Sequence, residues 1–372
     1  MSLNIQTGDE IICTQRKKER KKERKKETLK LRFSNIELLR IISMLMVILS
    51  HYYCHGNFPE DSFLSANKIV MQLLSCGGKI AVDIFVIISG YFLVTQKFSW
   101  LKLSKFLSTT YFWSLSVLIF SISLFGIESL RPDLIQKSLI PITPISWFAR
   151  AYLHLYLIFP LLNKLIYRLE KKKLLLIISS LLIVFFVVPT IKNVALGGYG
   201  NSLFMFSCLY FIGAYLRLYT NDRIEKNLLY IGILGLSIIW SSVIIFDYLG
   251  LNDTYYTVKA NIISFPSSGA NIFVLFAALG LFVYFKRMSI SYNKYINTIA
   301  ATTFAIYLIH DNSLINDWLW NKIICGSNFY HSDFLVVHMV VSCIAIFIVC
   351  SMLDLLRINY IEKAILSRLF NK

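Results

Sequence analysis

Long apolar segments recur along the whole chain, and they constrain the fold more than any other feature of the sequence. A helix needs about 17–25 mostly apolar residues to cross the hydrocarbon core of a bilayer, and about ten such segments are present. They lie near residues 36–53, 79–95, 106–126, 148–166, 173–191, 200–218, 226–247, 268–286, 296–315 and 333–357. Only 16% of the residues are charged, whereas a soluble domain carries about 25%. The sequence therefore predicts an all-α integral membrane protein with about ten transmembrane helices in one bundle.

Basic residues are distributed unevenly between the two sides of the predicted bundle. Eleven of the 38 Lys and Arg residues lie in the segment from Arg16 to Arg32. If this segment is cytoplasmic, the loops on the same side hold most of the remaining Lys and Arg, as cytoplasmic loops of membrane proteins generally do. The sequence therefore predicts that both termini are cytoplasmic and that the chain is a multi-pass protein of the cell membrane.

The chain divides into three parts by composition. Residues 1–32 contain RKKE repeats, which are typical of solvated segments, so we expect a disordered, basic cytoplasmic tail. Residues 33–357 form the predicted transmembrane domain, and residues 358–372 form a predicted cytoplasmic C-terminal tail. The formal net charge of +17 is concentrated in the basic tail and the inner loops. This distribution favours contact with solvent or with the anionic headgroups of the lipid bilayer, and it argues against a nucleic-acid partner.

The first apolar segment, LLRIISMLMVILSHYYCH, carries ionisable residues near both of its ends. Arg40 and His51 are eleven positions apart, about three helical turns, so their side chains share one face about 16 Å apart along the axis. Structural explanations compete here: Arg40 could reach the headgroups or pair with Glu37, and His51 could be a hydrogen-bonded residue at the interface. Ionisable residues within a bilayer are nevertheless functional candidates by default, because burying them costs free energy.

The histidines at the end of this segment also have part of a metal-binding pattern. His51 and His55 are four positions apart, as in the HExxH motif of zinc enzymes. That motif requires a glutamate after the first histidine, whereas Tyr52 follows here. The sequence therefore predicts no metal site.

Polar residues in other predicted spans fall at about the same depth as His51. Because polar residues often gather near span ends, this could be a coincidence, but we favour a shared polar pocket that faces outward. The candidates are Asp83 in the second span, Arg150, Tyr152 and His154 in the fourth, and His310 and Asp311 in the ninth, with Ser89 nearer the membrane centre.

These residue types suggest that a group is handed across the membrane from a phosphorylated donor to a hydroxyl. A histidine removes a proton from a hydroxyl near neutral pH when a carboxylate orients it, so we expect His51 to act with Asp83 or Asp311. Arg40, near the inner end, suits a phosphate group. Coenzyme A has a phosphorylated head and a long thin arm ending in a thioester, and the arm is comparable in length with the rise from Arg40 to His51. Coenzyme A therefore fits as the donor, and we expect no tightly bound cofactor.

The chain resembles the membrane-bound acyltransferase-3 family, the integral O-acyltransferases that modify bacterial surface polysaccharides. Arg40 and His51 have the spacing of the arginine and histidine in the first span of that family. The segment GGKIAVDIFVIISGYFL is similar to its second motif, and SWFARAYLHLYLIFPLLN and FAIYLIH are similar to its fourth and late spans. The resemblance covers about residues 33–357.

The resemblance implies acyl transfer, most simply of acetyl, from acyl-CoA to a hydroxyl of a carbohydrate acceptor, a polysaccharide or a lipid-linked glycan. His51 matches the proposed catalytic histidine of the family, and Arg40 matches an essential arginine. Many members have arginines after the second motif where this chain has lysines, which bind phosphate without a bidentate fork. The predicted roles are catalysis by His51, Asp83 and His310, donor binding by Arg40, Lys102 and Lys105, and acceptor binding by Ser89, Arg150, Tyr152 and His154.

Two other functions also fit a polytopic membrane protein with a polar pocket. A polysaccharide flippase or small-molecule transporter usually shows internal repeats with broken helices in matching halves, and the sequence shows no such repeat. A membrane glycan polymerase usually has large outer loops, whereas the predicted outer loops here are short. Both remain alternatives to the acyltransferase function.

Overall fold

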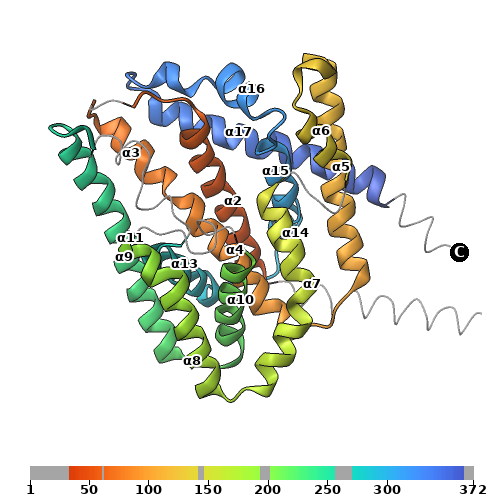
Figure 1. The fold of residues 1–372 in the computed structure, drawn as a ribbon, viewed down its shortest axis with the longest axis vertical. Coiled ribbons are helices and arrows are strands. Elements are labelled where there is room, and N and C mark those ends of the chain that lie inside the picture. Colours follow the sequence, from red (N-terminus) through yellow and green to blue (C-terminus); the bar gives the residue numbers. More distant parts are fainter. Residues whose placement is uncertain (1–32, 61–62, 141–145, 193–201, 256–269, 364–372) are drawn as a thin grey trace, which may run out of the picture.

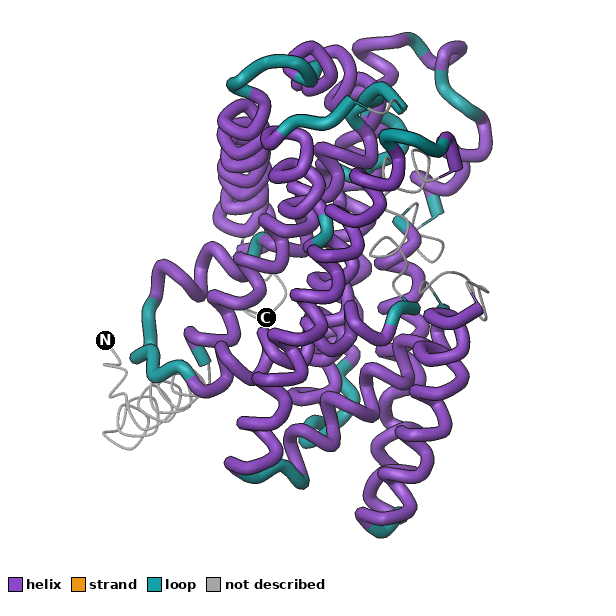
Figure 2. The backbone as a smooth tube through the Cα atoms, turned by 90° about the vertical axis from the view of Figure 1, so that its left-hand side faces the viewer, coloured by secondary structure: helices purple, strands orange, loops and turns teal. Residues whose placement is uncertain are grey.

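The structure is a computed structural model that describes residues 33–60, 63–140, 146–192, 202–255 and 270–363. Throughout these residues the chain forms helices joined by loops, and they contain no strand (Figures 1 and 2). The all-α fold class predicted from the sequence is therefore confirmed. The predicted basic tail at residues 1–32 and the end of the predicted C-terminal tail lie outside the described residues.

The helices follow the order of the predicted spans. The α-helices are α2 (Ser34–His55), α3 (Ala66–Ser75), α4 (Gly77–Leu93), α5 (Trp100–Phe125), α6 (Pro132–Leu139), α7 (Trp147–Arg168), α8 (Lys171–Leu182), α9 (Val188–Lys192), α10 (Leu203–Leu218), α11 (Asp222–Gly250), α13 (Ile272–Arg287), α14 (Lys294–Ala300), α15 (Thr303–His310), α16 (Asn316–Trp318) and α17 (Leu335–Leu356). The chain is π-helical at Ile183–Val187, Leu319–Ile324 and Arg357–Glu362, and 3-10 helical at Ile127–Ser129 and Gly326–Phe329. The last helical segment continues past the predicted domain boundary at residue 357.

Six helical segments among the described residues are long and apolar enough to cross a membrane. They are Ser34–His55, Ala66–Leu93, Trp100–Phe125, Lys171–Ile191, Asp222–Gly250 and Leu335–Glu362. The other predicted spans coincide with α7, α10, α13 and the α14–α15 pair, which are shorter or less apolar. The chain is therefore a multi-pass membrane protein by its helices, while the count of about ten spans and the cytoplasmic termini remain predictions.

We call the end of the bundle at which α2 begins the inner end and the opposite end the outer end. The two helices α2 and α4 are antiparallel, because Phe33 packs against Phe92 at the inner end while Ser50 meets Gly78 near the outer end. The start of α5 and the end of α17 also lie at the inner end, where Lys105 pairs with Glu362 at 2.6 Å.

Helix α4 lies at the centre of the bundle and packs against α2, α10 and α13 (Figure 1). It approaches α10 closely at two glycines. A Cβ atom on Gly90 would lie 2.4 Å from the carbonyl oxygen of Tyr210, and one on Gly213 would lie 2.3 Å from that of Ile87. Small residues let helix backbones come this close within a membrane. The glycine of the SGY sequence is thus required by packing.

The inner end of α2 is anchored by Asn35. Its Nδ2 atom donates hydrogen bonds to the carbonyl oxygens of Phe285, Lys286 and Met288 at 2.9, 3.1 and 3.2 Å. Helix α13 ends at these residues, so the amide satisfies carbonyl groups that lack partners within the helix. This contact fixes the rotation of α2 about its axis, and with it the direction of Arg40.

The outer end of α2 is anchored to α17. The hydroxyl of Tyr52, a fully buried residue, lies 2.8 Å from Nδ1 of His338. The ring of Phe329 stacks on His338 with the centroids 3.9 Å apart. The residue next to Tyr52 is His51, which is therefore held on a helix that is fixed at both ends.

Candidate active site

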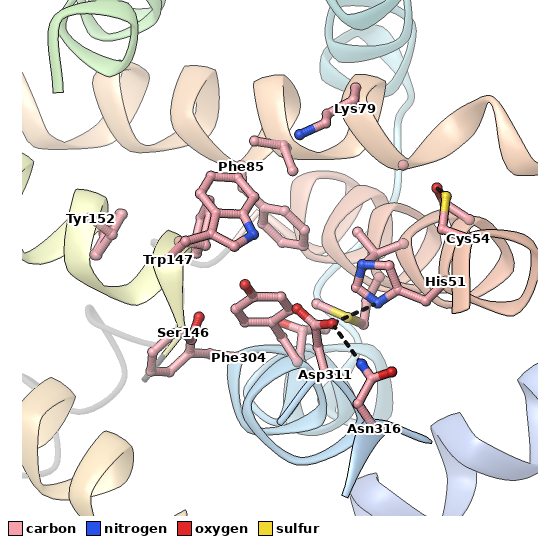
Figure 3. A pocket seen from close by; sticks show the side chains of 18 of the residues that line it. His51, Cys54, Lys79, Phe85, Ser146, Trp147, Tyr152, Phe304, Asp311 and Asn316 are labelled. Carbon is pink, nitrogen blue, oxygen red and sulfur yellow. Dashed lines mark hydrogen bonds and ion pairs between the residues drawn. The ribbon is translucent and has the colours of Figure 1, made fainter. Parts of the chain in front are cut away.

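A cavity of about 830 Å³ lies between α2, α4, α5, α7 and the segment from α15 to α16. Arg40 and His51, both on α2, line this cavity. They lie on the same face of the helix, about 16 Å apart along its axis. Figure 3 shows Lys79, Phe85, Trp147 and Tyr152 on the wall formed by α4 and α7, with His51, Asp311 and Asn316 across the cavity. The rest of the lining is Met44, Val47, Ser50, Cys54, His55, Gly78, Val82, Ser89, Phe106, Ser146, Phe148, Thr303, Phe304, Tyr307, Ser313 and Asp317.

A chain of hydrogen bonds fixes which nitrogen of His51 carries its proton. His310 is fully buried, and its Nδ1 atom lies 2.6 Å from the carbonyl oxygen of Ile306. A carbonyl oxygen only accepts, so Nδ1 of His310 donates, and Nε2 of the neutral ring is an acceptor. Nδ1 of His51 lies 3.0 Å from that Nε2 atom and therefore donates to it. The remaining nitrogen of His51, Nε2, is left without a proton.

Asp311 reinforces this arrangement. Its Oδ1 atom lies 3.6 Å from Nδ1 of His51 and 3.2 Å from Nε2 of His55. The amide of Asn316 donates to the same oxygen at 3.5 Å. Both neighbours of His51 Nδ1 are thus acceptors, which keeps the proton on that nitrogen, and Figure 3 shows the other ring nitrogen facing the cavity.

His51, His55 and Asp311 also have the spacing of a metal site, since one ligand atom from each lies within 4.8 Å of the others. The histidine pair noted in the sequence thus gains a carboxylate from a distant part of the chain. A metal bound by His51 through Nδ1 would have to replace the proton that this atom shares with His310 and Asp311. The hydrogen bonds therefore favour a general base over a metal ligand, and the absence of a metal stays a prediction.

Arg40 presents its guanidinium to the inner part of the cavity. Its nearest acidic neighbour is Glu37, with 3.9 Å between Arg40 Nε and the carboxylate, too long for a hydrogen bond. The Nε atom is buried and has no hydrogen-bond partner among the described residues, while 34% of the side chain is exposed. The guanidinium thus has donors to offer to an anion.

The structure brings together some of the predicted catalytic residues and separates others. His51 and His310 are in contact, and Asp311 is the carboxylate beside them. Asp83 is fully buried on α4 and does not line the cavity, because the lining face of α4 carries its neighbour Val82, about 100° away around the helix. Of the two carboxylates that the sequence offered as partners of His51, only Asp311 contacts it.

Only some of the residues predicted to bind the acceptor line the cavity. Ser89 and Tyr152 line the cavity. His154 is exposed on α7, two positions after Tyr152, and Arg150 is also outside the lining. The depth of these residues follows from their position in the span, but the direction of each side chain follows from how α7 is rotated.

Lys102 and Lys105, predicted to bind the donor, lie at the inner end of α5 outside the main cavity. They line a second, smaller cavity of about 210 Å³, together with Arg357 at the end of α17. Lys105 pairs with Glu362, and Lys102 donates to the side-chain oxygen of Gln96.

Sequence reasoning missed Lys79 and Trp147 as lining residues. Lys79 lies with its Nζ atom 5.0 Å from the ring centroid of Trp147, a cation–π contact between α4 and α7. Each stands at the outer start of an apolar span, where a basic or aromatic residue is usually an interface anchor. Their position close to the predicted pocket depth was the signal that could have identified them.

The site can accept a proton at one end and hold an anion at the other. The unprotonated Nε2 atom of His51 faces the cavity, and closer to the inner end Arg40 has N–H donors without partners among the described residues. Between them the wall is largely aromatic and aliphatic. Such a cavity suits a long ligand with a charged head and an apolar arm.

Comparison with known proteins gives one family. A family model described as an acyltransferase domain matches residues 33–355. Neither the comparison with curated proteins nor that with solved structures gave a match. The matched region runs from the residue before α2 to near the end of α17, and so contains every residue that lines the main cavity.

Proposed function

Because the chain belongs to the membrane-bound acyltransferase-3 family, we propose that it carries an acyl group across the membrane to a carbohydrate. The donor is acyl-CoA, most simply acetyl-CoA, on the cytoplasmic side. The acceptor is a hydroxyl of a cell-surface polysaccharide or of its lipid-linked precursor. The chain is thus a membrane acyltransferase.

The observation that carries the proposal is that Arg40 and His51 line one cavity from opposite ends. The phosphates of coenzyme A would bind at the guanidinium, which makes charge-assisted hydrogen bonds to phosphate oxygens. The thioester at the end of the arm would then reach the level of His51, about 16 Å away along the helix axis. The aromatic wall of Trp147 and Tyr152 would face the acceptor sugar.

The chemistry follows from the protonation of His51. Its Nε2 atom accepts the proton of the acceptor hydroxyl while the hydroxyl oxygen attacks the carbonyl carbon of the thioester. The carbon–sulfur bond breaks when the tetrahedral intermediate collapses. The leaving thiolate takes the proton from His51, which yields an ester and free coenzyme A. During the transfer the imidazolium is stabilised by Asp311, 3.6 Å from Nδ1.

The test compares membranes and polysaccharide from cells with and without this chain. Membrane vesicles that contain it are expected to transfer label from radiolabelled acetyl-CoA to a carbohydrate fraction, and the NMR spectrum of the surface polysaccharide should lose its O-acetyl signals when the gene is deleted. Unchanged O-acetyl signals together with intact acetyl-CoA would contradict the proposal and favour a transporter. Loss of the polymer itself would favour a polymerase.

Replacement of Arg40 should weaken use of the donor. Arg40→Ala removes a charge-assisted contact worth about 1.5–3 kcal/mol, so the KM for acetyl-CoA is expected to rise by about 10–100-fold. Arg40→Lys should recover part of this, because an ammonium meets phosphate without the bidentate fork. The measurement is the initial rate of label transfer against acetyl-CoA concentration. An unchanged KM in Arg40→Ala would remove Arg40 from the donor site.

A further inference from the structure

Two cavities in the described part of the chain, the main cavity and the smaller inner one, meet at one pair of aromatic residues. Phe106 on α5 and Phe304 on α15 line the main cavity that contains His51, and both also line the smaller inner cavity. They are the two residues shared by the linings of these cavities. Figure 3 shows Phe304 at the wall of the main cavity. The pair is therefore the common wall between the two spaces.

The geometry of this wall is a stack of two rings. The ring centroids of Phe106 and Phe304 are 4.9 Å apart with an angle of 23° between the planes. Both side chains are only half-buried, because each borders empty space on two sides, unlike the close-packed rings of the core. Such side chains change rotamer more readily than fully packed ones. The two phenylalanine side chains that separate the cavities therefore have room to change conformation.

The two sides of the wall differ in chemistry. On the inner side lie Lys102, Lys105 and Arg357 at the inner end of the bundle. Arg357 is paired with Asp354, which also lines this cavity, and with Glu362, so the two lysines are the cations available to a ligand. On the other side the main cavity leads to His51. The exposed ammonium of Lys105 is held by Glu362, a partner that a phosphate could replace. A donor that enters from this side must pass its arm between Phe106 and Phe304 before its phosphates reach Arg40, which lines the main cavity.

We propose that Phe106 and Phe304 form an aromatic closure through which the acyl arm of the donor enters the main cavity, and that the width of the opened closure selects the acyl group. The proposal rests on the proposed function, since it assigns a route to the same donor. A thin arm with an acetyl end passes when the rings separate, whereas a bulky acyl end is held back. With no donor bound, the stacked rings separate the main cavity from the smaller inner cavity.

A reversible cross-link tests the route. In the full-length chain, Phe106→Cys/Phe304→Cys is treated with a short bis-methanethiosulfonate, which forms a disulfide with each cysteine thiol and releases sulfinate, and dithiothreitol then reduces these disulfides. Label transfer from radiolabelled acetyl-CoA is measured in membrane vesicles. We expect the cross-link to lower the rate by at least about tenfold and the reductant to restore it. The control is Phe185→Cys/Phe204→Cys, which replaces a stacked pair 6.3 Å apart that borders neither cavity and should keep its rate after cross-linking.

Acyl selectivity gives a second measurement that does not depend on cross-linking. Phe304→Ala and Phe304→Leu widen the closure, so the rate with benzoyl-CoA relative to acetyl-CoA is expected to rise by about tenfold or more. A cross-linked pair that keeps its full rate, or a selectivity equal to that of the unaltered chain, would overturn the closure while leaving the acyltransferase function intact. If the unaltered chain transfers no label from acetyl-CoA, the result contradicts the proposed function itself and not only the closure.

Discussion

Replacement of His51 by Ala is expected to abolish acyl transfer while the protein stays inserted in the membrane. The substitution removes the unprotonated Nε2 atom that we propose accepts the hydroxyl proton, and general bases contribute about 10²–10⁴-fold to such reactions. His51 is only partly buried, with 18% of its side chain exposed to the cavity, so its loss should cost little packing. The measurement is label transfer from acetyl-CoA in membrane vesicles, with the amount of inserted protein determined by immunoblot.

The matched control for this substitution is His154→Ala. His154 was predicted from the sequence to lie at the same depth, but it is exposed on α7 and does not border the cavity. We expect this variant to retain its activity. Equal loss of activity in both variants, or full activity in His51→Ala, would contradict the assignment of His51 as the base.

Replacement of His310 should produce the second-largest loss, although His310 does not face the cavity. Its Nε2 atom accepts the proton on Nδ1 of His51, and without this acceptor His51 can carry its proton on either nitrogen. His310→Ala is expected to lower kcat by about 10²-fold or more, as loss of an orienting partner does in other enzymes with a histidine base. The KM for acetyl-CoA should change little, because Arg40, the proposed binding site of the donor phosphates, is near the other end of α2.

The conservative variant His310→Gln separates positioning from packing. The side-chain oxygen of glutamine can accept from Nδ1 of His51, so this variant should recover part of the activity that the alanine variant loses. Because His310 is fully buried, both variants are also compared by the temperature at which they lose their monodisperse state in detergent. Recovery of thermal stability without any recovery of kcat would show that His310 serves only packing.

The two predictions depend on a single feature, the connection of α2 to α15 at the outer end of the bundle. Asp311 follows the last residue of α15, and its carboxylate contacts both His51 and His55. His51 and His310 are 259 positions apart in the sequence, and α4 and α17 hold α2 in place for their contact.

Much of the architecture could be predicted from the sequence because it depends on local properties. The length of an apolar segment is read directly from its residues, and each of the predicted spans coincides with helix in the structure. The shared face of Arg40 and His51 follows from helical periodicity alone, and both residues do line one cavity. The depths of His51 and His310 were likewise predictable from their positions in the spans.

The direction of each side chain around its helix could not be predicted in the same way. Asp83 and His154 lie at suitable depths, yet neither borders the cavity, whereas Lys79 does. The rotation of α4 is fixed by the close approach of Gly90 and Gly213, a contact between segments far apart in the sequence. Periodicity tells which residues share a face, but not which neighbour that face meets.

The sequence by itself determined that this chain is a helical membrane protein of the acyltransferase-3 family with Arg40 and His51 on one face of its first span. Only the tertiary structure decided that Asp311 and His310 are the groups beside His51, and that Phe106 and Phe304 separate two cavities. The physical reason is that span length and helical periodicity are properties of a segment. Helix rotation and cavity shape arise from packing between segments.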